Sequence, residues 1–145
     1  MSLDQLLFRN EIVREPLVAG EIERLLATVD RRLQDAAHKS LHPETRLEQA
    51  YHAILACAVI GLRAHGLRPV GRPGHHVVAL ESLADTMAVT LDRIDYFQTL
   101  RDLRNKDIYT GASHVSDSQA REAVEEAVRL AEDARAWLRA QHQRA

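Results

Sequence analysis

Apolar residues recur every three to four positions along most of the chain, which is the period of an amphipathic helix. This spacing predicts helices over residues 21–39, 43–66, 75–88, 91–106 and 116–142. No stretch alternates convincingly between apolar and polar residues with period two, so we expect no sheet. The pattern therefore predicts an all-α protein, an antiparallel bundle of four to five main helices joined where possible by short connections.

Residue types at the expected helix ends agree with these boundaries. Gly66 is a natural helix stop, and segment 67–74 contains two prolines and two glycines, which is the composition of a loop. Thr90 can cap the helix that follows it. Ser116 and Gln119 fit a capping box, in which each side chain bonds the other residue's backbone N–H.

The bulk composition allows one folded domain. The chain has 145 residues, of which 46% are apolar, so a sizeable core is possible without disulfides. Residues 1–19 are ambiguous and are assigned to an N-terminal extension or a short helix, and residues 20–142 to the helical domain. The single cysteine, Cys57, excludes an internal disulfide and lies in an apolar run, so we expect a buried thiol.

Nothing in the sequence points to a membrane. The longest apolar stretch, 54–62, is too short to cross a bilayer, and the N-terminus lacks a basic start followed by an apolar run. We therefore expect a cytoplasmic protein with no membrane contact.

The densest polar cluster lies in residues 100–111, at the end of a predicted helix. Arg101, Arg104 and Asn105 share one face of that helix, since residues three and four apart are neighbours. The guanidinium of arginine forms two parallel hydrogen bonds with a phosphate and keeps its charge. The net charge is −2, so any contact with nucleic acid has to come from a local patch such as this one.

Two interpretations of this cluster stay open. In the first it is a phosphate site, where the hydroxyl of Tyr109 assists proton transfer to a leaving oxygen. In the second it is an exposed helix end held only by salt bridges, with Asp102 pairing with Lys106 and Arg104 with Asp107.

Common nucleotide and metal signatures are missing. The chain has no GxxxxGK[ST], GxGxxG, HExxH or CxxC motif, which argues against a P-loop NTPase, a Rossmann enzyme, a zinc protease and a zinc finger. His75 and His76 are adjacent at a helix start and would point about 100° apart, so they cannot chelate one metal well. We expect no metal and no cofactor, and we place the two histidines against the backbone or an acidic residue, or beside a cleft.

The cluster resembles the HEPN family of nucleotide-binding helical domains. The mark of that family is an Arg at the end of a core helix, usually followed by Asn, Asp or His, with a His four to six residues after the Arg. Arg104-Asn105 matches the first half, whereas Tyr109 stands where the family has its His. Further similarities to one bacterial branch are Glu44-Thr45-Arg46-Leu47 before Ala50-Tyr51, Gly66-Leu67-Arg68-Pro69, Gly74-His75-His76, and Asp95-Tyr96-Phe97 before Leu100-Arg101.

The resemblance implies an assembly and a set of site residues. It implies a HEPN-like bundle that forms a homodimer, with the Arg104 helices of two subunits facing one another across a cleft. The candidate catalytic residues are Arg104, Asn105 and Tyr109, and the candidate binding residues are Arg101, Asp107, His75, His76 and Tyr51.

Three functions follow as alternatives. The first is a HEPN-like protein that binds RNA or a nucleotide, or docks a nucleotidyltransferase-like or antitoxin partner in a toxin–antitoxin or stress-response system. We favour it because Tyr109 replaces the histidine, and a phenol is a poor base at neutral pH. The second is an active metal-independent endoribonuclease. The third is a non-catalytic scaffold, which would have Arg101 and Arg104 fully paired with carboxylates.

Overall fold

The computed structural model describes residues 1–111 and 114–144, and 72% of the described residues are helical. The expectation of an all-α protein is confirmed in that the chain is mostly helical. The elements in chain order are α1 (Leu3–Phe8), β1 (Ile12–Arg14), α2 (Glu21–Ala36), α3 (Pro43–Ala64), β2 (Leu67–Pro69), α4 (His75–Glu81), α5 (Leu83–Thr86), α6 (Leu91–Thr110) and α7 (Asp117–Arg144).

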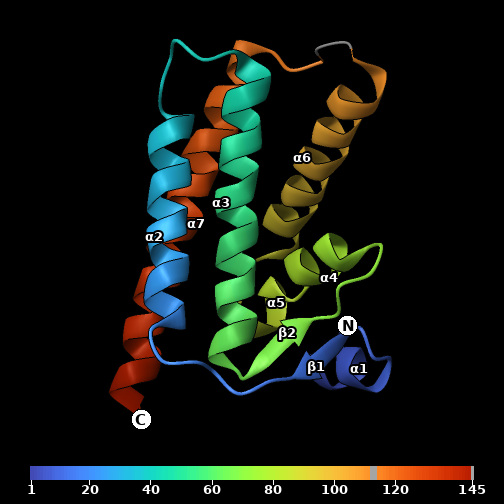
Figure 1. Ribbon diagram of the computed structural model, residues 1–145, viewed down its shortest axis with the longest axis vertical. Helices are drawn as coiled ribbons and strands as arrows, with labels where there is room; N and C mark the ends of the chain where they lie inside the picture. Colours follow the sequence, from blue (N-terminus) through green and yellow to red (C-terminus); the bar gives the residue numbers. More distant parts are fainter. Residues whose placement is uncertain (112–113, 145) are drawn as a thin grey trace.

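The long helices form a bundle around α3. Helix α2 runs antiparallel to α3, α7 packs behind both of them, and α6 runs along the other side of α3 (Figure 1). Alanines allow the close approach, because small side chains let helix axes lie near one another. The fully buried alanines of α3 and α7 are Ala50, Ala53 and Ala58 in α3 and Ala120, Ala123, Ala127 and Ala134 in α7.

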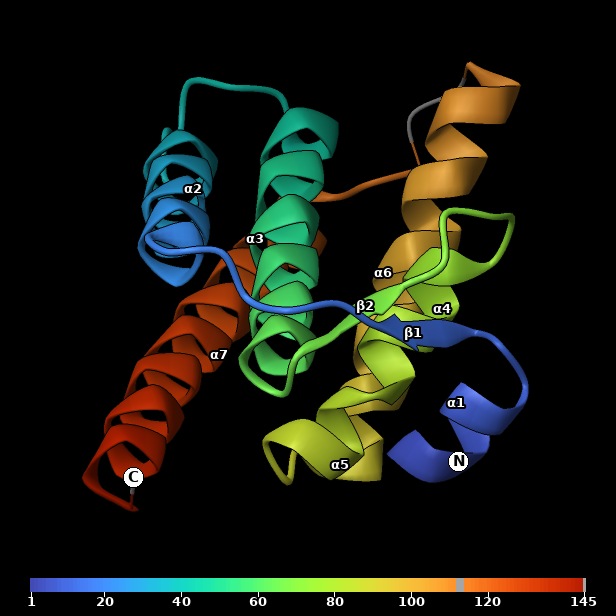
Figure 2. The ribbon, with the colours of Figure 1, turned by 60° about the horizontal axis from the view of Figure 1, so that its bottom comes forward.

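A small sheet corrects the expectation that the chain has none. Strands β1 and β2 pair antiparallel, with Val13 opposite Arg68, beside α1 at one end of the molecule (Figure 2). Each strand has only three residues, which is too short for a period-two pattern to register. The first part of the segment expected to be a loop is therefore β2.

The N-terminal segment packs against the end of α3. Leu6 of α1 and Ile12 of β1 are fully buried and form a second apolar cluster with Leu62 and Leu67. Helix α1 begins with a capping box between Ser2 and Gln5, and the strand pairing then holds the segment in place.

Some helix ends differ from those expected. The single helix expected over 75–88 is divided at Ser82, whose buried hydroxyl donates to the carbonyl of Ala79 at 2.6 Å, a local bond that competes with regular helix geometry. Helix α6 continues past Lys106 to Thr110 and ends at Gly111, which has a positive φ of 68°.

The two N-terminal caps expected from the sequence have different outcomes. Thr90 has the extended backbone of an N-cap, but its side chain makes no capping bond. The capping box of α7 is confirmed. The Ser116 hydroxyl accepts from the Gln119 N–H at 3.1 Å, and the Gln119 side chain accepts from the Ser116 N–H at 2.9 Å.

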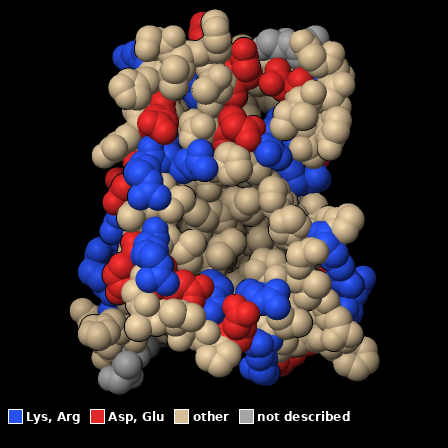
Figure 3. Space-filling view, in the orientation of Figure 1, with Lys and Arg blue, Asp and Glu red and all other residues tan. Residues whose placement is uncertain are grey.

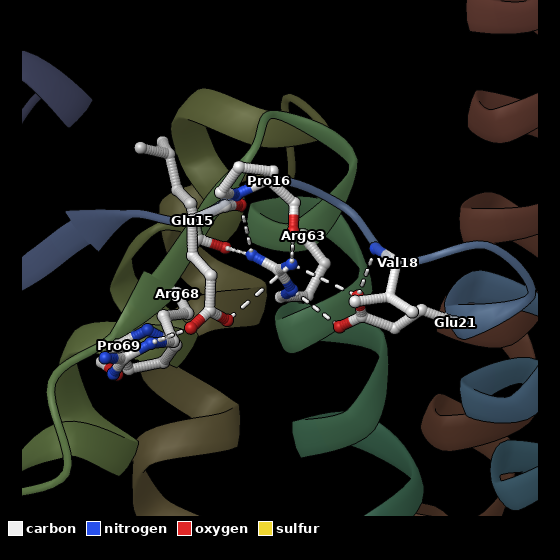
Figure 4. A network of polar contacts seen from close by, with 8 residues as sticks. Glu15, Pro16, Val18, Glu21, Arg63, Arg68 and Pro69 are labelled. Carbon is white, nitrogen blue, oxygen red and sulfur yellow. Dashed lines mark hydrogen bonds and ion pairs between the residues drawn. The ribbon is translucent and has the colours of Figure 1, made fainter.

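A buried arginine ties the N-terminal segment to the bundle (Figure 4). Arg63, near the end of α3, is only 3% exposed. Its Nε donates to Glu21 at 2.6 Å, and its two terminal nitrogens donate to the carbonyls of Glu15, Pro16 and Leu67, each at 3.0 Å, and to the second Glu21 oxygen at 3.1 Å. One side chain therefore connects α3, β2 and the segment before α2.

Candidate phosphate pocket

The polar cluster of α6 faces α3, where it meets a carboxylate that the sequence interpretation did not include. The Nε of Arg104 donates to both carboxylate oxygens of Glu48, at 2.9 and 2.8 Å, and its guanidinium lies 5.5 Å from the ring centre of Tyr51. Glu48 also accepts from Nε2 of His52 at 2.8 Å. The hydrogen bonds from His52 and then Arg104 hold the pKa of Glu48 below its ordinary value, against the effect of burial.

Tyr51 connects this group to α4. Its side chain is fully buried, and its hydroxyl lies 3.1 Å from Nδ1 of His76. Burial raises the pKa of Tyr51 to about 12, so the phenol keeps its proton at neutral pH. Burial, together with the charges of His75 and Arg104, lowers the pKa of His76 to about 4, so its imidazole is neutral at pH 7.

A pocket of about 480 Å³ lies next to these residues, between α6 and the start of α4. We call it the α4–α6 pocket. Its described lining has arginines, histidines and an amide but no carboxylate, because it consists of Gly71, Arg72, Pro73, Gly74, His75, His76, Val77, Arg101 and Asn105. Basic side chains over α6 and over the segment before α4, with uncharged surface between them, are visible on this face (Figure 3).

Arg101 is held at the edge of this pocket. Its Nε donates to Gln98 at 3.2 Å and its Nη2 to Asp102 at 2.9 Å, and the amide of Gln98 donates to the carbonyl of Val77 in α4 at 3.1 Å. The position of the guanidinium is therefore set by α6 and α4 together. Its partner Asp102 is exposed and lies outside the lining of the pocket.

A second cavity, of about 520 Å³, lies between α6 and α7. Its lining includes the carboxylates of Asp102 and Glu122 together with Lys106, so it has no excess of positive charge. The slightly larger volume therefore does not make it the better site for an anion, and the α4–α6 pocket is the stronger candidate.

The structure brings together most of the residues expected at the site. Arg101, Asn105, His75 and His76 line one pocket, and Arg104 and Tyr51 form the contacts next to it. The second interpretation predicted two ion pairs within α6, and that prediction is wrong. Arg104 pairs with Glu48 rather than with Asp107, and Asp102 pairs with Arg101 rather than with Lys106.

Two expected residues lie outside the pocket lining. Tyr109 is 84% exposed and lies one helical turn beyond Asn105, so it extends the same face of α6 outward. Asp107 is partly buried and does not contribute to the lining.

Sequence reasoning missed several contributors. Glu48 and His52 are four residues apart in α3, and Glu48 lies three residues before Tyr51, so the polar positions of that helix could have identified them. Arg72 lies in a segment rich in proline and glycine, and no periodicity connects it with α6. Its place in the pocket follows only from the path of the chain between β2 and α4.

Comparison of the chain with protein-family models, curated proteins and solved structures gave no match. Within the described residues, no group of His, Cys, Asp and Glu side chains is arranged to hold a metal ion. No described helix is both long and apolar enough to cross a membrane.

Proposed function

We propose that the α4–α6 pocket binds a phosphate group of RNA or of a nucleotide. The observation that carries this proposal is the charge of the lining, in which Arg72, Arg101 and Asn105 meet two histidines and no described carboxylate. Arginine and amide N–H groups are strong donors to phosphate oxygens. Their clustering supplies a local positive field in a chain whose net charge is −2.

The size of the pocket favours one nucleotide unit as the bound element. Small-molecule sites have volumes of about 300–1,000 Å³, and the 480 Å³ of this pocket lies in that range. Tyr109, one turn farther along α6 and almost fully exposed, is available to stack on a base of a single-stranded segment. We therefore favour single-stranded RNA or a free nucleotide over a duplex.

Fluorescence anisotropy with a labelled single-stranded RNA tests this proposal. We expect Arg101→Gln and Arg72→Gln to weaken binding about tenfold each and to lower its salt dependence. Arg129→Gln is the matched control, because it removes the same charge from an exposed side chain of α7 that forms an ion pair with Glu126. Equal loss in all three variants would mean nonspecific charge attraction, and no binding by the wild-type chain would refute the proposal.

The HEPN-like identity and its homodimer belong to the same proposal. Ile108 and Tyr109, 54% and 84% exposed, leave apolar surface at the outer end of α6, the helix that the resemblance places at the dimer cleft. The same surface fits a nucleotidyltransferase-like or antitoxin protein of a toxin–antitoxin or stress-response system. Light scattering of the purified chain, with Ile108→Glu in parallel, distinguishes a dimer from a monomer that needs another partner.

Two observations bear on the alternative functions. Glu48 holds the Nε of Arg104, and Tyr109 lies outside the lining, so this pocket lacks the pair that the endoribonuclease hypothesis uses. The scaffold hypothesis gains from the carboxylate partners of Arg101 and Arg104. It predicts no RNA binding and no effect of Arg72→Gln, so the anisotropy experiment separates it from phosphate binding.

A further inference from the structure

The two histidines of the α4–α6 pocket are fixed in opposite tautomers by their neighbours. Nδ1 of His75 lies 2.9 Å from the carbonyl oxygen of Arg72. A carbonyl oxygen can only accept, so Nδ1 of His75 carries the hydrogen and donates it. In the neutral imidazole the other nitrogen, Nε2, is then left with a lone pair and acts as an acceptor.

His76 has the reverse arrangement. Its Nδ1 contacts the hydroxyl of Tyr51, and this is the only hydrogen bond of that fully buried hydroxyl to the described residues. If the imidazole donated, the buried phenol hydrogen would be left without a partner, at a cost comparable to a lost hydrogen bond. The Tyr51 hydroxyl therefore donates to Nδ1, and Nε2 of His76 carries the hydrogen. The depressed pKa of His76, about 4, keeps this imidazole neutral.

The two rings lie against each other, with centres 4.4 Å apart and planes at 79°. The residues that line the pocket therefore include an imidazole able to accept at Nε2, that of His75, and groups able to donate, the Nε2–H of His76 and the guanidinium groups of Arg72 and Arg101. A phosphate oxygen can only accept, so it bonds to the donors. The acceptor on His75 needs a different ligand group, one that carries a hydrogen close to the phosphate.

We infer that the pocket is selective for a phosphate ester with a neighbouring hydroxyl, as in a ribonucleotide, with His75 accepting from the hydroxyl while His76 and the arginines bind the phosphate. The ribose 2′-hydroxyl is the group that distinguishes RNA from DNA at a binding site. This inference rests on the proposed phosphate binding and adds the class of sugar. Tyr51 acts as a positioning residue, because it sets the tautomer of His76 from beneath the pocket.

Calorimetry with two matched nucleotides tests the selectivity. Adenosine 3′-monophosphate carries a 2′-hydroxyl beside its phosphate, and 2′-deoxyadenosine 3′-monophosphate lacks only that group. At pH 8 we expect the ribonucleotide to bind about fivefold more tightly, the effect of one hydrogen bond. His75→Ala should lose the preference and bind the two nucleotides with equal affinity. Arg129→Gln is the control that keeps it.

The outcomes separate this inference from the proposed function. Equal affinity for the two nucleotides, or a preference that survives His75→Ala, overturns the selectivity and leaves phosphate binding intact. Failure of both nucleotides to bind overturns both proposals.

Nitrogen NMR shifts of the unliganded protein test the tautomers without any ligand. In the wild-type chain we expect the hydrogen on Nδ1 of His75 and on Nε2 of His76. In Tyr51→Phe we expect a mixture of the two tautomers at His76. The same tautomer at both residues of the wild-type chain contradicts the inference.

Discussion

Replacing Arg63 by methionine should destabilise the protein far more than the same change at Arg68. Both side chains form ion pairs with Glu15, but Arg63 has a side chain 4% exposed whereas that of Arg68 is 43% exposed. Methionine keeps much of the apolar stem and removes the guanidinium. The comparison therefore isolates the buried polar contacts from the exposed one.

The size of the effect follows from the partners that Arg63 leaves behind. Removing it takes the donor from three backbone carbonyls in the junction of α3, β2 and the N-terminal segment, and leaves the Glu21 carboxylate with its bond from the N–H of Val18. Leaving a buried acceptor without its hydrogen bond typically costs about 1–3 kcal/mol. An exposed pair such as Arg68–Glu15 contributes about 0–1 kcal/mol.

Urea unfolding followed by circular dichroism measures both losses. Trp137, which stacks on His65 at the C-terminal end of α3 with ring centres 5.5 Å apart, gives a second, fluorescence probe. We expect Arg63→Met, which leaves three carbonyls without a donor, to lower the free energy of unfolding by about 3 kcal/mol or more, and Arg68→Met by less than about 1 kcal/mol. Equal losses in the two variants would refute the reasoning that burial makes the Arg63 contacts important.

Three further predictions concern packing, thiol reactivity and pH. Gly61→Ala would place a Cβ 2.6 Å from Oγ1 of Thr86, so thermal unfolding should show a loss of about 1–3 kcal/mol. Burial raises the pKa of Cys57 to about 12, so a thiol reagent should react with it only after denaturant unfolds the chain; rapid reaction without denaturant would contradict this. Arg63, and after it the N–H of Val18, lowers the pKa of Glu21 to about 2, so stability from these contacts should be full above about pH 5 and should decline as pH falls towards 2, a decline that is smaller in Arg63→Met.

The sequence predicted the long helices because each buries a periodic apolar face. The seam of α3 around Tyr51 and Ile54 is buried as the pattern requires, and Cys57 lies in the same core. Strands β1 and β2 could not be predicted, because three residues carry no usable period and their pairing joins positions such as Val13 and Arg68 that are distant in the chain. The break at Ser82 depends on a local side-chain bond that an apolar pattern does not report.

The candidate site could be predicted only on one helix. Residue spacing places Arg101 and Asn105 one turn apart on α6, and both line the α4–α6 pocket. Spacing within α6 cannot show that Glu48 of α3 holds Arg104. Nor can it show that Tyr51 contacts His76, because those contacts depend on how three helices pack.

Chemical-shift mapping of the ¹⁵N-labelled protein with adenosine 3′-monophosphate tests the central claim most directly. The account predicts saturable shifts concentrated at residues 71–77 and at Arg101 and Asn105, and their loss in Arg72→Gln/Arg101→Gln. The absence of saturable shifts in the folded wild-type chain, or shifts concentrated in the cavity between α6 and α7, would contradict it.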